Sequence, residues 1–165
     1  MDDGKARMGK LMEQQDKPTM LIRRWVGCWI DLLVATALFF VPAIIAGIVG
    51  EDAGFAIAGA LAFLIIPGYF VVAELVWGRT LGKLITGTVV VGIDGRKAGL
   101  GRVLVRTLLR LVEVNPFLLG GLPAGVAVLA SPRMQRLGDM AAGTYVLPAK
   151  DCERFRRRLA EEVFD

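Results

Sequence analysis

Two carboxylates stand inside long apolar stretches of this sequence, where an ionised side chain is costly. Asp31 is the single charged residue of residues 25–50, and Glu74 is the single one of residues 53–77. An aspartate at the centre of a membrane helix costs about 2.5–3.5 kcal/mol on insertion scales, and such residues usually face a bundle interior with a partner. Carboxylates in this position either bind a proton or a cation or clamp helices together.

The absence of histidine from the sequence removes several kinds of chemistry. Ser-His-Asp and Cys-His catalysis, histidine metal ligands and histidine proton relays all require it. Cys28 and Cys152 lie far apart and neither belongs to a CxxC pair, so no metal site or disulfide framework is expected. We expect no enzyme and no cofactor, and any proton chemistry falls to carboxylates, lysine or tyrosine.

Arg24 begins the first apolar stretch and shares one helical face with Asp31. Seven positions separate the two residues, about 10 Å along a helix axis, and the arginine side chain leans toward the helix N-terminus. Side chains on a helix pair well at three or four positions, so a direct pair is not expected. The expected partners are Arg102, Arg106 or Arg110 for Asp31, and Asp139 or Glu74 for Arg24.

An arginine stripe follows the second apolar stretch. Arg102, Arg106 and Arg110 recur every four residues within residues 100–113, which predicts an amphipathic helix with all three on one face. Two interpretations are open. The helix either lies on anionic lipid at the membrane surface, or it directs its arginines at the carboxylates of the membrane helices.

Simpler roles are also open for three other polar features. Glu74 lies about one turn from the end of its apolar stretch and can reach the membrane interface, and Asp139 can cap a helix or a turn. Residues 78–83, GRTLGK, have three residues between the glycines and Leu after the lysine. A phosphate-binding P-loop needs four residues and Ser or Thr. We therefore expect a turn where the chain leaves the bilayer.

The apolar stretches are long enough to cross a bilayer, whose core of roughly 30 Å needs about 20 apolar residues in a helix. We expect full spans at about residues 25–49 and 55–77 of this chain, of which 55% is hydrophobic. A third apolar segment, at about residues 111–131, is interrupted by prolines and glycines. It forms either a third span or one arm of a helical hairpin.

Lysine and arginine indicate which side of the membrane each segment occupies. They are frequent before residue 25 and in residues 78–110, and absent between the two apolar stretches. Short loops rich in these residues stay cytoplasmic. We expect a multi-pass protein of the bacterial cytoplasmic membrane, with residues 1–20 as a cytoplasmic tail. Residues 149–165 form a basic tail that contacts anionic lipid rather than nucleic acid.

A strand-like pattern interrupts the helical one after the second span. Residues 88–91 are β-branched, and Asp94-Gly95 is a strong hairpin-turn signal. We expect a short cytoplasmic β-hairpin at about residues 85–98, with residues 143–148 as a candidate third strand. The expected fold is an all-α membrane bundle of two full spans, the broken third segment and this hairpin.

Together these features resemble the RDD family of bacterial membrane proteins, named for one arginine and two aspartates. The resemblance covers residues 20–148 and includes GRTLGKLITGTVVVGIDG after the second span and RLGDMAAGT near the end. It implies that Arg24 is the named arginine and that Asp31 and Asp139 are the two aspartates.

This chain departs from the family pattern where members usually carry glutamine and often histidine. It has Arg79 within the first motif and Gly138 before the second aspartate.

The resemblance implies a transport-related role, since transport has been proposed for the family and cation/proton exchange attributed to some members. We expect movement of an ion, a proton or a small solute, by a homo-oligomer or as a subunit of a membrane complex. Arg24, Asp31 and Asp139 would form the charge site. The alternative is a non-catalytic scaffold or assembly subunit in which the same charges clamp the bundle.

Overall fold

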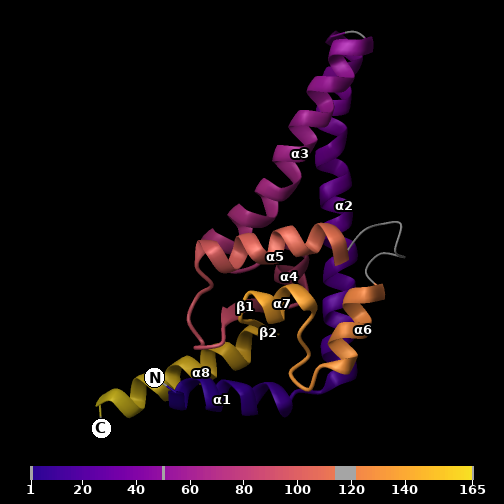
Figure 1. The fold of residues 1–165 in the computed structure, drawn as a ribbon. Helices are drawn as coiled ribbons and strands as arrows, with labels where there is room; N and C mark the ends of the chain where they lie inside the picture. Colours follow the sequence, from indigo (N-terminus) through magenta and orange to yellow (C-terminus); the bar gives the residue numbers. More distant parts are fainter. Residues whose placement is uncertain (1, 50, 114–121, 165) are drawn as a thin grey trace.

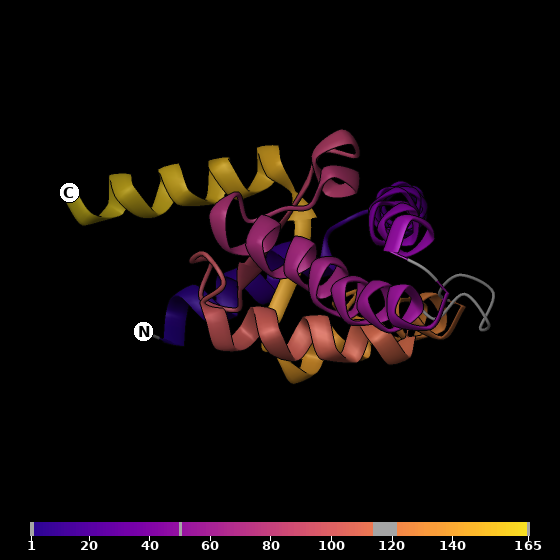
Figure 2. The same ribbon diagram turned by 90° about the horizontal axis from the view of Figure 1, so that it is seen from above.

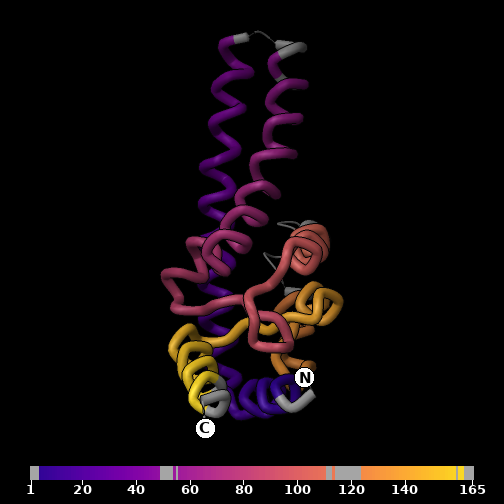
Figure 3. Tube along the Cα trace, turned by 90° about the vertical axis from the view of Figure 1, so that its left-hand side faces the viewer, coloured from indigo at the N-terminus to yellow at the C-terminus, as the bar shows by residue number. Residues whose placement is uncertain are grey.

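Two long helices form a hairpin that projects from a body of shorter helices and strands (Figures 1 and 3). The computed structural model describes residues 2–49, 51–113 and 122–164, and the hairpin consists of α2 (Lys17–Val49) and α3 (Glu51–Val76). Lys17–Ile48 and Ala56–Val76 are long and apolar enough to cross a membrane. These helices contain the two stretches predicted as spans.

The hairpin is closed by small residues and covered with large apolar ones. Ala46, Ala58 and Ala62 are buried, and a Cβ atom on Gly54 would lie 2.3 Å from the Ala46 carbonyl oxygen. Small residues allow membrane helices to approach closely. The large exposed side chains include Leu33, Phe40, Ile44, Ile48, Phe63 and Leu64. Such a surface suits the hydrocarbon of a bilayer rather than water.

The body at the foot of the hairpin is built around a two-stranded antiparallel sheet. In the sheet, β1 (Thr88–Gly92) pairs with β2 (Thr144–Pro148), with Val90 opposite Val146 at the centre. The helices of the body are α1 (Asp2–Glu13), α4 (Leu81–Ile85), α5 (Leu100–Glu113), α6 (Leu122–Ala130), α7 (Leu137–Ala141) and α8 (Ala149–Phe164).

The two faces of the sheet are covered by different helices. Val91, Tyr145 and Leu147 pack against Met8 and Met12 of α1 and against Cys152 and Phe155 of α8. On the other face, Val90 and Val146 pack against Val103 of α5 and Val71 and Leu75 of α3. Alternate strand residues therefore enter two separate cores. In Figure 2, α8 starts at one end of β2 and α5 lies near the other end.

The segment predicted as a cytoplasmic tail is largely helical and is packed against the body. Helix α1 covers Asp2–Glu13 and α2 begins at Lys17, and Met8 and Met12 of α1 are fully buried against the sheet. The polar composition of residues 1–20 concealed this role, because a few well-placed methionines are enough to dock a short helix on an apolar surface.

The predicted β-hairpin is present only as its turn. Gly95 has φ +74°, and the Gly92 N–H donates to the Arg96 carbonyl at 2.8 Å. The return arm meets β1 at one isolated bridge, Val91 to Lys97. Since α5 begins at Leu100, no room remains for a second arm. The strand that does pair with β1 is β2, which was predicted only as a third strand.

Whether the third apolar segment, at about residues 111–131, forms a span or one arm of a helical hairpin stays a prediction. Its described part includes α6, whose nine residues are too few to cross a bilayer. Residues 114–121 lie outside the described residues.

Replacing Leu147 with alanine should lower the free energy of unfolding by about 2–5 kcal/mol, because the side chain is fully buried between the sheet and its helices. Thermal unfolding in a neutral detergent measures the change. Leu108→Ala is the control, since Leu108 is exposed on α5. Equal losses of stability in the two variants would contradict this assignment of the core.

Candidate functional site

Helix α5 turns its arginine face toward the protein interior. Leu100, Leu104 and Leu108 are exposed, whereas Arg106 is fully buried and Arg110 is 8% exposed. The interpretation that places this stripe on surface lipid is therefore wrong for both buried arginines. Arg102, at the start of the stripe, is half-buried and pairs with Asp94 at 3.3 Å.

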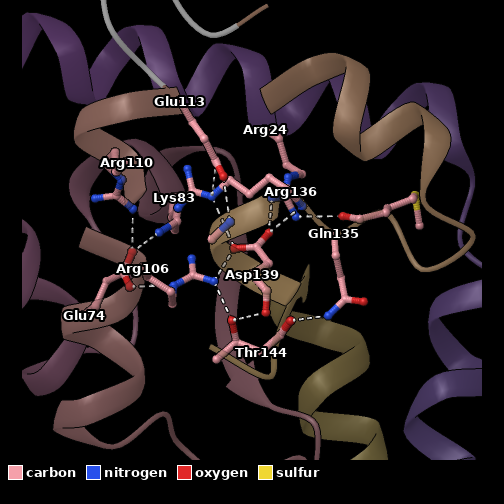
Figure 4. A network of polar contacts seen from close by, with 12 residues as sticks. Arg24, Glu74, Lys83, Arg106, Arg110, Glu113, Gln135, Arg136, Asp139 and Thr144 are labelled. Carbon is pink, nitrogen blue, oxygen red and sulfur yellow. Dashed lines mark hydrogen bonds and ion pairs between the residues drawn. The ribbon is translucent and has the colours of Figure 1, made fainter. Parts of the chain in front are cut away.

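Arg106 connects two carboxylates that come from different helices (Figure 4). Its Nε donates to Glu74 of α3 at 3.0 Å, and its Nη1 donates to Asp139 of α7 and to the Thr144 hydroxyl at 2.7 Å. The side chains of Arg106, Glu74 and Asp139 are all fully buried. A buried charge is tolerated only when it is paired, so this one residue ties α3, α5 and α7 together.

Further cations complete the environment of the two carboxylates. Glu74 also pairs with Lys83 and, at 2.7 Å, with Arg110. Asp139 also pairs with Arg24 and, at 3.2 Å, with Arg136. With Glu113, which accepts a hydrogen bond from the Gly138 N–H at 2.7 Å, these side chains form what we call the charge cluster: Arg24, Glu74, Lys83, Arg106, Arg110, Glu113, Arg136 and Asp139.

The electrostatics of the cluster follow from burial and from this crowding of charges. Burial alone would raise the pKa of Asp139, but Arg106, Arg24 and Arg136 outweigh it and hold that pKa well below its ordinary value. Burial lowers the pKa of Lys83 to about 7. Its effect, together with repulsion from the neighbouring arginines, outweighs the attraction of Glu74.

Asp31 lies apart from the charge cluster and caps the short helix α4. One carboxylate oxygen accepts from the Gly82 N–H at 2.9 Å and from the Tyr69 hydroxyl at 3.1 Å, and the other accepts from the Thr80 hydroxyl. A carboxylate at a helix N-terminus satisfies free N–H groups and is favoured by the helix dipole. The expected pairing of Asp31 with an arginine of α5 is therefore wrong, because hydroxyl and backbone donors satisfy this carboxylate.

The expected separation of the charges on α2 is found. Arg24 pairs with Asp139, one of its two expected partners, and also donates to the Met134 carbonyl at 3.1 Å. Asp139 has its expected capping role as well, since it accepts from the Arg136 backbone N–H at 3.3 Å. Glu74, for which an interface position was one option, is buried within the cluster.

The geometry around Asp31 recurs in the second half of the chain. Residues 80–91, TLGKLITGTVVV, and residues 136–147, RLGDMAAGTYVL, share the pattern L-G-x4-G-T-x-V at a separation of 56 positions. Each forms a five-residue helix, a glycine with positive φ (+68° at Gly87, +59° at Gly143) and a strand. The strand pairing has the same symmetry. A shift of 56 positions converts Thr88 into Thr144 and Gly92 into Pro148, and the register pairs Thr88 with Pro148 and Gly92 with Thr144.

The polar partners of these two motifs correspond as well. Asp31 accepts from the Gly82 N–H, and Glu113 accepts from the equivalent Gly138 N–H. Asp31 follows Arg24 by seven positions, as Glu113 follows Arg106. The site is thus assembled from two related halves that meet at the sheet.

Lys83, Glu113 and Arg136 were missed when the sequence was considered alone. The repeat identifies Glu113, which follows Arg106 as Asp31 follows Arg24, and it identifies Lys83 as the residue after the motif's L-G. It does not identify Arg136, because the equivalent residue is Thr80. Lys83 and Asp139 hold equivalent positions in the two short helices, with opposite charges.

A cavity of about 430 Å³ opens beside the charge cluster. Its lining includes Asp31, Lys83, Arg106 and Arg110, and its apolar walls come from α2 and α3. Among the described residues, no group of three or more histidine, cysteine, aspartate or glutamate side chains is placed to hold a metal ion.

Comparison with known proteins agrees with the sequence motifs. A sequence model of the RDD family matches residues 18–143. No match was found among curated proteins or among solved structures.

The two related glycines should respond differently to the same substitution. A Cβ atom on Gly82 would lie 2.0 Å from the Gly27 carbonyl oxygen and 2.9 Å from Cγ of Asp31, whereas one on Gly138 would lie 3.4 Å from its nearest neighbour, on Leu109. Gly82→Ala should therefore separate α4 from α2 and lower the melting temperature by several degrees, and Gly138→Ala should lower it by much less. Thermal unfolding of both variants tests this, and equal effects would contradict it.

Lys83 should give the protein a pH-dependent stability above neutral pH. Its pKa is about 7 in the folded protein, against an ordinary value of 10.5. Between these values the unfolded chain binds more protons, so stability rises with pH from about 7 toward 10, by at most about 1.4 kcal/mol per pH unit.

The measurement is the free energy of unfolding between pH 7 and 9, where Lys83→Met should remove this rise. Lys97→Met, at an exposed position, should leave it intact. The same pH dependence in Lys83→Met as in the unaltered protein would refute this assignment.

Proposed function

Because the chain belongs to the RDD family, we propose that it is a transport-related membrane protein that moves an ion or a small solute. The observation that carries the proposal is the cavity of about 430 Å³ beside the buried charge cluster, at the foot of two helices that can span a membrane. Binding sites of this kind combine apolar walls with a few fixed polar groups.

The roles that we propose for the charges differ between Asp31 and the cluster. Asp31 accepts three hydrogen bonds from Tyr69, Thr80 and Gly82, so it positions α4 and is poorly suited to capture a passing cation. Arg106 and Arg110 line the cavity together with Lys83. We propose that these cations face the solute, and that Lys83 exchanges a proton near neutral pH because its pKa is about 7.

The alternative function is a non-catalytic scaffold in which the same charges only hold the helices in place. The ties that Arg106 makes between α3, α5 and α7 favour it. A clamp alone does not require charges, however, because well-packed apolar residues often stabilise a buried position equally well. The cavity beside the cluster therefore favours transport.

The orientation and assembly that we propose follow from the charge distribution. The body carries most of the lysines and arginines, so we propose that it faces the cytoplasm, with the basic α8 near anionic lipid. A two-span chain is small for alternating access. We therefore propose a homo-oligomer or a subunit of a larger membrane complex.

Filling the cavity should abolish transport without changing any charge. Ala35 is buried and lines the cavity on α2, so Ala35→Phe should lower flux at least tenfold. Ala37 is exposed on the same helix, and Ala37→Phe should change flux less than twofold. The assay is a pH-sensitive dye inside reconstituted vesicles, with gradients of Na⁺, K⁺, chloride, acetate or decyl phosphate applied in turn.

The scaffold alternative makes the opposite prediction in the same assay. If the unaltered protein gives no flux above protein-free vesicles with any gradient, the transport proposal fails. Equal flux in Ala35→Phe and Ala37→Phe would reject the cavity as the solute site.

A further inference from the structure

The cavity is lined by an excess of positive charge. Its lining contains six cations, Arg23, Arg24, Lys83, Arg106, Arg110 and Arg136, and one carboxylate, Asp31. Both Asp31 oxygens already accept hydrogen bonds from Tyr69, Thr80 and Gly82. The charge cluster and Asp31 together bring four arginines against four carboxylates, and Lys83 adds a fifth positive charge when it is protonated, below its pKa of about 7.

Two buried arginines also have donors that are not used within the described residues. Nη2 of Arg106 and Nη1 of Arg110 are buried and have no hydrogen-bond partner there. An unpaired buried donor costs about 1–3 kcal/mol, and more when it is charged. Both residues line the cavity, so an acceptor bound in the cavity would remove this cost.

Arg136 contributes less to this argument. Its Nη2 is also unpaired, but so is the Glu113 Oε2, and Nε of Arg136 lies 4.0 Å from that oxygen. A small rotation of either side chain would join them. The case for a bound anion therefore rests on Arg106 and Arg110.

Apart from Thr36, Thr88 and Thr107, the remainder of the cavity lining is largely apolar, and its apolar part extends along the hairpin of α2 and α3. Leu32, Ala35 and Phe39 come from α2, and Ile66 and Phe70 come from α3. The Phe70 ring also lies 4.0 Å from the Arg110 guanidinium carbon, which holds that guanidinium in position. An inorganic anion would satisfy the arginines and leave this wall in contact with water.

We propose that the cavity binds an amphiphilic anion, a phosphate or carboxylate group carried on an acyl chain. The anionic oxygens accept hydrogen bonds from Arg106 Nη2 and Arg110 Nη1, and the chain lies along Leu32, Phe39 and Ile66. Guanidinium groups match the oxygen geometry of phosphate and carboxylate well. This inference names the solute class of the proposed function and rests on it for movement, although binding itself requires no transport.

The test is ligand binding by the full chain in a neutral detergent, followed as the shift in melting temperature. The probes are decyl phosphate and decanoate, with inorganic phosphate and decyltrimethylammonium for comparison. Decyl phosphate and decanoate should stabilise the protein, inorganic phosphate should do so far more weakly, and the cationic probe should not. Equal stabilisation by the cationic probe would overturn the inference.

Three variants locate the site. Arg110→Gln removes one unpaired donor, and Ala35→Phe fills the cavity while leaving every charge in place, so it still tests the inference if Arg110→Gln fails to fold. Each should raise the Kd for decyl phosphate at least tenfold. Arg102→Gln, on the same helix but outside the cavity, should change it less than twofold. Unchanged binding in Ala35→Phe would overturn the inference.

Native mass spectrometry distinguishes the two sources of the ligand. Retention of phosphatidylglycerol in preference to phosphatidylcholine would support a bilayer lipid as the ligand, and retention of decanoate alone would support a free fatty acid. Binding without flux in the vesicle assay would reject transport but keep this inference. Flux without binding of either anionic probe would reject this inference but keep transport.

Discussion

Burial of the Arg106 guanidinium constrains more of this structure than any other interaction. A charge removed from water must be neutralised, and Glu74 and Asp139 do so from two other helices. Helix α5 consequently directs Arg106 and Arg110 inward, while Leu100, Leu104 and Leu108 are exposed. The polar face of this amphipathic helix is therefore its buried face, and the end of α3 and the short helix α7 are fixed by the same contact.

The two related halves explain why the charges occupy their positions. In each half a carboxylate caps a five-residue helix, Asp31 at Gly82 and Glu113 at Gly138. The halves then differ at the equivalent positions Lys83 and Asp139. This difference in sign gives each arginine or lysine a carboxylate to pair with. The positive charge next to the cavity is in excess by one only while Lys83, whose pKa is about 7, is protonated.

Features that depend on local composition could be predicted from the sequence. The two helices that are long and apolar enough to span a membrane follow from apolar length, the turn at Asp94-Gly95 from its residue types, and the separation of Arg24 from Asp31 from helical geometry. The expected pairing of Arg24 with Asp139 was one of two options, and the structure contains it.

Features that depend on tertiary contacts could not be predicted in the same way. The hairpin signal at Asp94-Gly95 gave no information on β2, which begins only at Thr144 and is the strand that pairs with β1. Amphipathicity predicted that the arginines of α5 share one face, but it did not predict that this face is buried, because burial depends on which distant elements pack against the helix. Docking of α1 depends on Met8 and Met12, which composition alone does not distinguish from tail residues.

A double-mutant cycle between Arg106 and Asp139 tests the central claim most directly. The free energy of unfolding in detergent is measured for the unaltered protein, Arg106→Met, Asp139→Asn and the double variant. If the buried pair holds α5 and α7 together, the single losses should overlap, with a coupling free energy of at least about 1 kcal/mol. Losses that add to within about 0.5 kcal/mol would contradict the account.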